Sequence, residues 1–555
     1  MRFSLKKEPR GLYEPVEVEE GTTLDQFVRA TRDQAAYPVY LAKIGNRYAD
    51  LREKIPEGAW VELLDMRNRA AQHAYVDSLC LLFITAVDRV MGGTRIEIAN
   101  SLNQGMYIEV RGTSPVPPEL TEKIAAEMRR LSGADELFRL EQRPRDEVIQ
   151  ILEDQGKVTH TVDLIRGMAK ERRLPIYTIA GMHHFAYGFI VPSAGYLGNW
   201  ELHSYKRGVL LRYPNDHLPD QLPPYRDQPK LYEAFSEQKR WDRITGVNYV
   251  QDLNRQIQEG EFREMVQISE ALHEKRIAEI ADRIKEEKRR IILIAGPSSS
   301  GKTTFARRLC VQLRVNGMSP LYMGTDDYFV EREHTPHDAN GEPNYEGFDA
   351  LDVDLFNRNM NDLLAGKKAD LPTFNFLTGH KEFGLRVTSV GQGQPIVIEG
   401  IHGLNARLTE EIPQKEKFKI YISPLTGMNI DEHNRVPTTD ERLLRRLVRD
   451  YLYRGHDAAA TLESWPKVRA GEDENIFPYS GEADALFNSY HIYEIPVLKR
   501  YAVPLLEKVG PEDPNYAEAQ WMLDFLKYFR EVKDDRAVPN NSIIREFIGG
   551  SIFVE

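Results

Sequence analysis

The feature that most constrains this chain is the stretch IILIAGPSSSGKTTFARRL at residues 291–309. An apolar run leads directly into a turn of small residues, then a lysine, two threonines and a helical pattern. The turn fits the spacing G-x-x-x-x-G-K-[ST], in which small residues let backbone N–H groups surround a phosphate. The glycine before the lysine opens a helix whose positive N-terminus faces the anion. The stretch therefore predicts a buried strand, a phosphate-binding loop and a helix, the start of an α/β sheet.

This loop predicts that the chain binds a nucleoside triphosphate. Lys302 is positioned to reach the β- and γ-phosphates, and the Thr303 hydroxyl is positioned to ligate Mg²⁺. We therefore expect ATP and Mg²⁺ as cofactors. The loop residues expected to bind ATP are Gly296, Pro297, Ser298, Ser299, Ser300, Gly301, Lys302, Thr303 and Thr304.

Acidic residues follow the next two predicted strands. LYMGT leads into Asp326 and Asp327, and PIVIEG carries Glu399. A carboxylate at the end of such a strand can orient or deprotonate an acceptor hydroxyl, and another can meet Mg²⁺ directly or through water. The alternatives are a loop-capping acidic pair and a surface acid at a strand end.

An arginine-rich segment, DERLLRRLVRDYLYRGHD, comes later in the chain. Arginines that close over phosphates neutralise the transferred group and exclude water. The alternative is a solvated helix face. The arginines with helical spacing are Arg442, Arg445, Arg446 and Arg449, and Arg454 lies just beyond.

Composition limits the class of protein. The chain has 555 residues, which is long for one core, so we expect several domains. Two cysteines exclude a disulfide scaffold and favour a reducing cytoplasm. We find no signal-peptide pattern and no apolar run that predicts a membrane span. The net charge of −12 argues against broad nonspecific binding of nucleic acid.

The order of patterns along the chain predicts an α/β nucleotide-binding fold with a parallel sheet and flanking helices, preceded by two smaller domains. Alternating strand and helix patterns after residue 290 indicate the parallel sheet. The predicted divisions are a small β-grasp-like domain at 1–64, an α+β domain at 65–225, a helical connector at 226–289, the nucleotide-binding domain at 290–510 and a C-terminal extension at 511–555.

Residues 290–510 resemble the uridine kinase/phosphoribulokinase family. Six motifs occur in order: GPSSSGKTT, DDYF, NYEGFDALD, LPTFNF, EGIHGL and DERLLRRLVRD. The resemblance implies an ATP-dependent P-loop kinase that phosphorylates a hydroxyl of a small, nucleoside-like metabolite. It implies catalytic roles for Lys302, for Asp326 as the base, and for Arg442 and Arg445. It further implies Mg²⁺ binding by Thr303 and Glu399, and ATP contacts from a lid with Arg449 and Arg454.

The acceptor-binding motifs depart from those of uridine kinases. Tyr345 and Glu346 stand where the family places an aromatic residue and an aspartate against the base and the ribose hydroxyls. The family's Y-D-F is Phe374-Asn375-Phe376 here, and its following histidine aligns with Gly379, next to His380. These departures argue against a fixed preference for pyrimidines and leave a sugar or another hydroxyl acceptor open beside a nucleoside. The residues expected to bind the acceptor are Asp326, Phe329, Tyr345, Glu346, Phe374, Phe376, His380 and Arg442.

The front of the chain resembles parts of threonyl-tRNA synthetases. Residues 1–64 resemble a TGS domain, and residues 65–225 resemble the second additional domain with a degenerate metal motif. Tyr75 and Leu79 stand where the synthetases carry two metal-binding histidines, and the adjacent His183 and His184 are poorly placed to chelate one metal.

Two functions remain open. The first is a kinase with a regulatory front half, and we expect it to form a homo-oligomer. The second is an RNA-associated P-loop NTPase that recruits RNA through the synthetase-like half. Residues 1–64 carry 10 Lys and Arg against 11 Asp and Glu, which is not a basic RNA-binding surface. Nucleic acid is therefore the less favoured partner, although it is not excluded.

Overall fold

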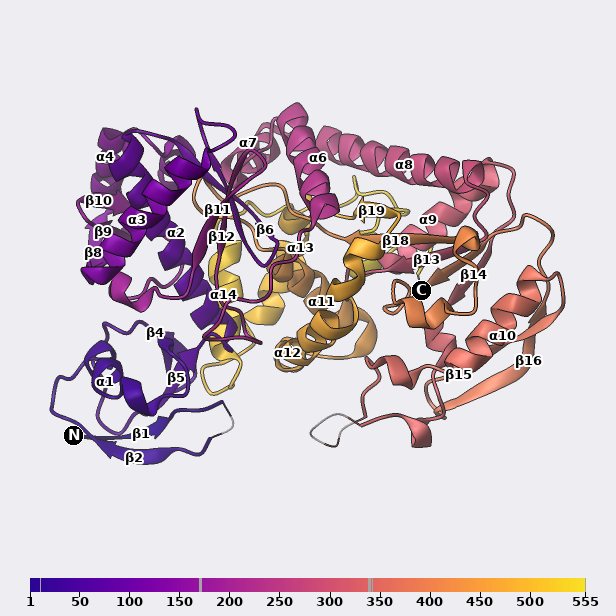
Figure 1. Cartoon of the computed structure of the whole chain (residues 1–555), viewed down its shortest axis with the longest axis horizontal. Coiled ribbons are helices and arrows are strands. Elements are labelled where there is room, and N and C mark those ends of the chain that lie inside the picture. The colour runs from indigo at the N-terminus through magenta and orange to yellow at the C-terminus, as the bar shows by residue number, and fades with distance from the viewer. Residues whose placement is uncertain (10, 169–171, 338–340, 342, 555) are drawn as a thin grey trace.

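The chain, described here by a computed structural model, forms two halves that meet along a central interface. The structure describes residues 1–9, 11–168, 172–337, 341 and 343–554. Figure 1 shows the first half at the left, the P-loop half at the right, and helices α11, α12 and α14 between them. None of the helices in these described ranges has the length and apolar character that crossing a membrane requires.

A five-stranded parallel sheet organises the P-loop half, as the alternation of patterns predicts. Its order is β14-β17-β13-β18-β19, so the first strand lies in the centre and the chain crosses over β17 to reach β14. This crossover brings the ends of β13, β14 and β17 to one edge of the sheet. The strands are β13 (Ile291–Ala295), β14 (Leu321–Gly324), β17 (Ile396–Glu399), β18 (Lys417–Ser423) and β19 (Ala485–Asn488).

Helices cover both faces of this sheet, and a two-stranded hairpin extends from it. Helix α8, in the predicted connector, packs along α9, and Ile277 and Ile284 are buried with Ile292 and Phe305 in one core. The predicted connector therefore lies against the P-loop half. The elements are α6 (Pro229–Thr245), α7 (Val250–Glu259), α8 (Phe262–Glu286), α9 (Lys302–Val315), α10 (Val353–Leu364), β15 (Ala369–Asn375), β16 (His380–Thr388), α11 (Thr438–Arg454), α12 (Ala458–Asn475) and α13 (Glu494–Leu506).

The C-terminal segment is part of the same core. Ile543, Ile544 and Phe547 have no exposed surface and pack with residues of α9 and α11. Apolar residues of this kind stabilise the segment by burial, ~1.5–3 kcal/mol for each large side chain. Its helices are α14 (Tyr516–Leu526) and α15 (Arg545–Ile548).

Residues 1–9 and 11–65 form a mixed five-stranded sheet of order β2-β1-β5-β3-β4, and helix α1 packs against it. The Thr23 side chain caps that helix by accepting a hydrogen bond from the backbone N–H of Gln26. The resemblance to a TGS domain stays a prediction. The elements are β1 (Arg2–Lys6), β2 (Glu14–Glu17), α1 (Leu24–Ala30), β3 (Val39–Ile44), β4 (Arg47–Ala49) and β5 (Trp60–Asp65).

The rest of the first half combines a long buried helix with two antiparallel sheets. Helix α2 spans Arg69–Met91, and most of its residues are buried. The sheets have the orders β11-β12-β7-β6 and β10-β9-β8. The resemblance to a synthetase domain stays a prediction. The remaining elements are β6 (Ile96–Leu102), β7 (Gly105–Val110), α3 (Pro118–Gly133), β8 (Arg139–Pro144), α4 (Arg145–Gln155), α5 (Thr159–Arg166), β9 (Arg173–Ile179), β10 (Met182–His184), β11 (Glu201–Tyr205) and β12 (Gly208–Arg212).

The loop at residues 424–437, between β18 and α11, joins the two halves, and we call it the interface loop. The Glu432 carboxylate accepts hydrogen bonds from the backbone N–H groups of His160 and Thr161, at 2.8 and 3.1 Å. The Asn429 amide donates to the Ile98 carbonyl at 2.7 Å. These contacts bind the loop before α11 to the first half.

Candidate active site

The phosphate loop between β13 and α9 has a shape that only glycine permits at two positions. A Cβ on Gly296 would lie 2.0 Å from the Ile422 carbonyl oxygen. Gly301 has a φ of +83°, and a Cβ there would lie 2.4 Å from the Ile543 side chain. A side chain at either position would displace the loop, which explains the spacing of the two glycines in physical terms.

Lys302 lies across this loop. Its Nζ donates to the carbonyl oxygens of Gly296 and Pro297, at 2.9 and 3.1 Å. Burial lowers the pKa of Lys302, and the carboxylates of Glu399 and Glu546 oppose that shift. The ammonium group is therefore held over the loop, where the sequence predicts that it meets phosphate.

Thr303 and Glu399, the two predicted metal ligands, lie together. The Thr303 hydroxyl donates to Glu399 Oε1 at 2.9 Å, and the Tyr322 hydroxyl donates to the same oxygen at 2.6 Å. Burial raises the pKa of Glu399. A hydroxyl and a carboxylate are hard oxygen donors of the kind that Mg²⁺ accepts, so these two residues fit the ion.

The structure separates the roles of the two adjacent aspartates after β14. Asp327 forms an ion pair with Arg386 at 2.7 Å and accepts from the backbone N–H of Phe374, so it fastens the β15–β16 hairpin. Asp326 is solvent-accessible at the sheet edge and lies within electrostatic reach of Lys302. Partial desolvation by the surrounding protein raises the pKa of Asp326, and Lys302 lowers it. This placement favours Asp326 as the group that meets an acceptor.

Arg442 and Arg445 lie behind the loop and hold its backbone. Arg442 donates to the Ser298 carbonyl at 3.1 Å and pairs with Glu472. Arg445 has no exposed surface, donates to the Ser299 carbonyl at 3.2 Å and pairs with Glu494 at 2.6 Å. These contacts fix the shape of the loop from outside and leave the predicted contact with a phosphoryl group as a hypothesis.

The other arginines of α11 gather around one buried carboxylate, that of Asp450. Arg446, Arg449 and Arg454 lie 3.2, 3.0 and 3.6 Å from its oxygens. Arg446 also donates to the Ser298 hydroxyl at 2.9 Å. Three guanidinium groups share one carboxylate, so the cluster has an excess of positive charge beside the loop, which suits a polyphosphate.

Four predicted acceptor-binding residues form one aromatic cluster. Phe329 lies 6.1 Å from Tyr345, 5.7 Å from Phe374 and 6.3 Å from Phe376, measured between ring centroids. Phe376 is 60% exposed and Tyr345 is 39% exposed, so the cluster presents open aromatic surface. Such surface can stack against a planar group of a ligand.

Glu346 and His380 lie in different surroundings. The Glu346 carboxylate is solvent-accessible and within electrostatic reach of Lys302 and Arg446. His380 is exposed, and its Nδ1 lies 3.3 Å from Glu331, so its recorded contact is with that carboxylate. Of the two, Glu346 is the residue that faces the charges of the loop.

Sequence reasoning missed two carboxylates that shape the loop. Glu472 of α12 accepts from the backbone N–H of Ser298 at 2.8 Å, and Glu546 of α15 accepts from the Thr304 hydroxyl at 2.7 Å. Thr304 is therefore bonded to the C-terminal segment. Neither carboxylate belongs to a motif. Both lie far from the loop in sequence, so no local pattern could predict either contact.

The fold and the site together define a P-loop kinase. Consistent with this class, residues 291–495 match the model of the Phosphoribulokinase / Uridine kinase family, and this region of the chain belongs to that family. The match covers the six motifs and ends within α13.

The relatives found by comparison each cover less than half of the chain. A protein named uridine kinase from Staphylococcus aureus (strain JH9) is 29% identical over 197 residues, which are 35% of this chain and 86% of that protein. A structure of a possible uridine kinase from Bacillus stearothermophilus is 23% identical, with a TM-score of 0.22, and covers 36% of this chain and 88% of its own. The structure of a D-glycerate 3-kinase from Cryptococcus neoformans var. grubii serotype A is 11% identical, with a TM-score of 0.20. The match covers 45% of this chain and 87% of that one.

Proposed function

We propose that the chain transfers the γ-phosphoryl group of ATP to a hydroxyl of a nucleoside-like metabolite. The observation that carries this proposal is the convergence of Lys302, Asp326 and the Thr303–Glu399 pair at the ends of three parallel strands. Phosphoryl transfer is catalysed mainly by positioning and charge stabilisation, and these groups supply both.

Each group has a definite task in this proposal. The loop N–H groups and Lys302 bind the phosphates of ATP, and Asp326 accepts the proton of the attacking hydroxyl. Thr303 and Glu399 hold Mg²⁺, which neutralises phosphate charge when it is bound. Arg446, Arg449 and Arg454 stabilise the charge that develops during transfer, while Arg442 and Arg445 keep the loop in shape.

The aromatic cluster and Glu346 support a nucleoside-like acceptor. The exposed rings of Tyr345 and Phe376 offer a stacking surface, and a carboxylate beside them can accept hydrogen bonds from a cis-diol. The name of the Staphylococcus relative points to the same class of acceptor. In this proposal the enzyme is a cytoplasmic homo-oligomer, and residues 1–225 form a regulatory half.

A thermal-shift screen tests the acceptor class. The full chain is heated with Mg²⁺, a nonhydrolysable ATP analogue and one ribonucleoside or sugar at a time. A ligand that binds only the folded state raises the melting temperature by mass action. We expect at least one ribonucleoside to raise it beyond the analogue alone, and a response to sugars without any response to nucleosides would contradict the proposed acceptor.

A further inference from the structure

A cavity lies between the two halves of the molecule, and no residue of the phosphate loop is among those that line it. Its volume is about 760 Å³, within the range of small-molecule binding sites. Its walls come from α2 and the segment at 213–228 in the first half, and from the interface loop, α12 and α14 in the second. We call it the interface cavity.

Two half-buried charged side chains of opposite sign line the interface cavity, and neither has a hydrogen-bond or ion-pair partner among the described residues. They are Asp77 of α2 and Arg435 of the interface loop. Each lies within electrostatic reach of the other. Burial raises the pKa of Asp77 to about 7 and lowers the pKa of Arg435. Charged side chains that the protein partly removes from water, as it does these two, are costly unless another group pairs with them.

The cavity wall also carries aromatic side chains among its polar and charged ones. Trp521 and Phe525 of α14 line it, as do Phe189 and Tyr213. A ligand that suits this arrangement presents an ammonium group to Asp77, a carboxylate to Arg435 and an apolar group to the rings. We propose that the interface cavity binds an α-amino acid with an apolar or aromatic side chain.

The cavity is connected to the phosphate loop through neighbouring residues of α12. Arg469 and Asp473 line the cavity, and Arg469 donates to Glu472 at 2.8 Å. Glu472 in turn accepts from Arg442 and from the backbone N–H of Ser298, both at 2.8 Å. A ligand that moves Arg469 therefore shifts the carboxylate that holds the loop, so binding in the cavity changes the affinity of the loop for ATP. This coupling rests on the proposed function of the loop.

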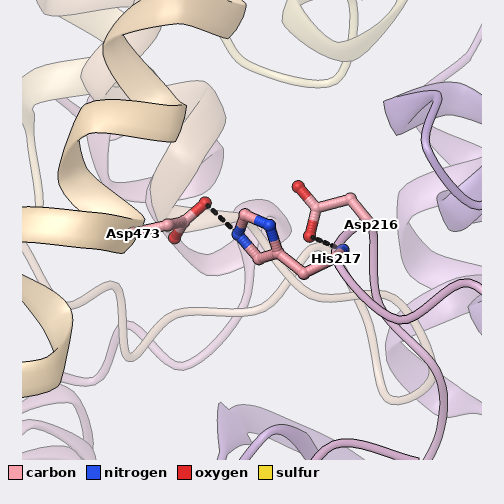
Figure 2. A group of neighbouring side chains, drawn as sticks. All are labelled: Asp216, His217 and Asp473. Atoms are coloured by element: carbon pink, nitrogen blue, oxygen red, sulfur yellow. Dashed lines mark hydrogen bonds and ion pairs between the residues drawn. The ribbon is translucent and has the colours of Figure 1, made fainter. Parts of the chain in front are cut away.

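The rim of the cavity also joins the two halves. Figure 2 shows His217, from the segment before α6, directed at Asp473 of α12, with Nε2 and Oδ2 3.6 Å apart. Asp216, His217 and Asp473 lie close enough together to suggest a metal site. However, the Arg469 guanidinium already lies 3.3 Å from Asp473 and balances its charge. We therefore interpret the three residues as a contact between the halves.

Calorimetric titration of the full chain tests the proposal. The probes are leucine, methionine, phenylalanine, tyrosine and tryptophan, each titrated singly in buffer without ATP. We expect at least one to bind saturably with one site per chain. Arg435→Met is expected to weaken that binding at least ~10-fold, because it removes a charged partner of the carboxylate. The matched control is Arg255→Met, at an exposed ion pair outside the cavity, and it should bind as the wild type does.

Blocked analogues of the bound amino acid test the zwitterion directly. The amide, which lacks the carboxylate, and the N-acetyl derivative, which lacks the ammonium group, should both bind at least ~10-fold more weakly. Arg435→Gln is the second variant if the methionine variant does not fold, and it should show the same loss. Failure of all five amino acids to bind, unchanged binding in a folded Arg435 variant, or full affinity for either analogue would overturn the proposal.

A separate titration isolates the coupling. A nonhydrolysable ATP analogue is titrated with and without the bound amino acid, and linkage requires that each ligand change the affinity of the other equally. We expect a shift of ~5-fold or more. An unchanged affinity for the analogue would overturn the coupling. Failure of the analogue to bind even without the amino acid would instead contradict the proposed function of the loop.

Discussion

At the phosphate loop Arg442 and Arg445 are each paired with a carboxylate of their own, whereas in the interface cavity Arg435 and Asp77 form no hydrogen bond or ion pair with any residue that the structure describes. Arg442 pairs with Glu472, and Arg445 pairs with Glu494. Paired arginines are already satisfied, so they can hold a backbone in place. Unpaired charges in a cavity can pair with a ligand. The two regions therefore suggest different roles, one in holding the phosphate loop and the other in binding a small molecule.

Among the substitutions at the phosphate loop, Lys302→Ala is expected to lower the rate of phosphoryl transfer the most. It removes the cation held over the loop, and phosphoryl transfer should fall ~10³-fold or more. Initial rates of ADP formation measure the loss, and a circular dichroism spectrum confirms the fold. Near-normal turnover by a folded variant would contradict the assignment of the loop.

Asp326→Asn should lower the transfer rate ~10²-fold, because it removes the proposed base and leaves ATP binding intact. Asp327→Asn is the matched control. Asp327 pairs with Arg386 in the hairpin, so its loss should cost ~1 kcal/mol or less of stability and little activity. The reverse pattern of rates would show that the two aspartates have been assigned the wrong way round.

Glu346→Gln should raise the KM for the acceptor ~10-fold and leave the affinity for ATP nearly unchanged. The variant should also discriminate less between a ribonucleoside and its 2′-deoxy analogue. Paired steady-state kinetics on both acceptors measure this. If the variant keeps the full preference for the ribonucleoside over its 2′-deoxy analogue, Glu346 does not bind the diol.

His217→Gln should have the smallest effect. The His217–Asp473 contact is exposed on the histidine side, and such pairs contribute ~1 kcal/mol or less. The free energy of unfolding in urea measures it. A loss of several kcal/mol would mean that the rim, rather than the buried bonds of Glu432, holds the halves together.

The sequence predicted the parts of the site that lie in short motifs. The strand, loop and helix at residues 291–309, and the meeting of Thr303 with Glu399, follow from local pattern and from the crossover of a parallel sheet. The partners from distant segments could not be predicted in this way. Glu546 contacts Thr304 across 242 residues of sequence, and no periodicity encodes such a pairing.

The interface cavity could be predicted from the sequence even less than these distant contacts. Asp77 and Arg435 come from α2 and from a loop near the other end of the chain, and each looks in sequence like an ordinary surface charge. Their meeting depends on how the two halves dock. That docking is fixed by contacts such as those of Glu432 and Asn429, which carry no recognisable motif.

The most direct test of the central claim is a balance of products. The full chain is incubated with ATP, Mg²⁺ and each ribonucleoside in turn, and ADP, phosphorylated nucleoside and inorganic phosphate are quantified together. The account predicts that ADP forms only with an acceptor, in equal amount to the phosphorylated nucleoside. ADP that forms at the same rate without an acceptor, accompanied by inorganic phosphate, would contradict it and identify the chain as an NTPase.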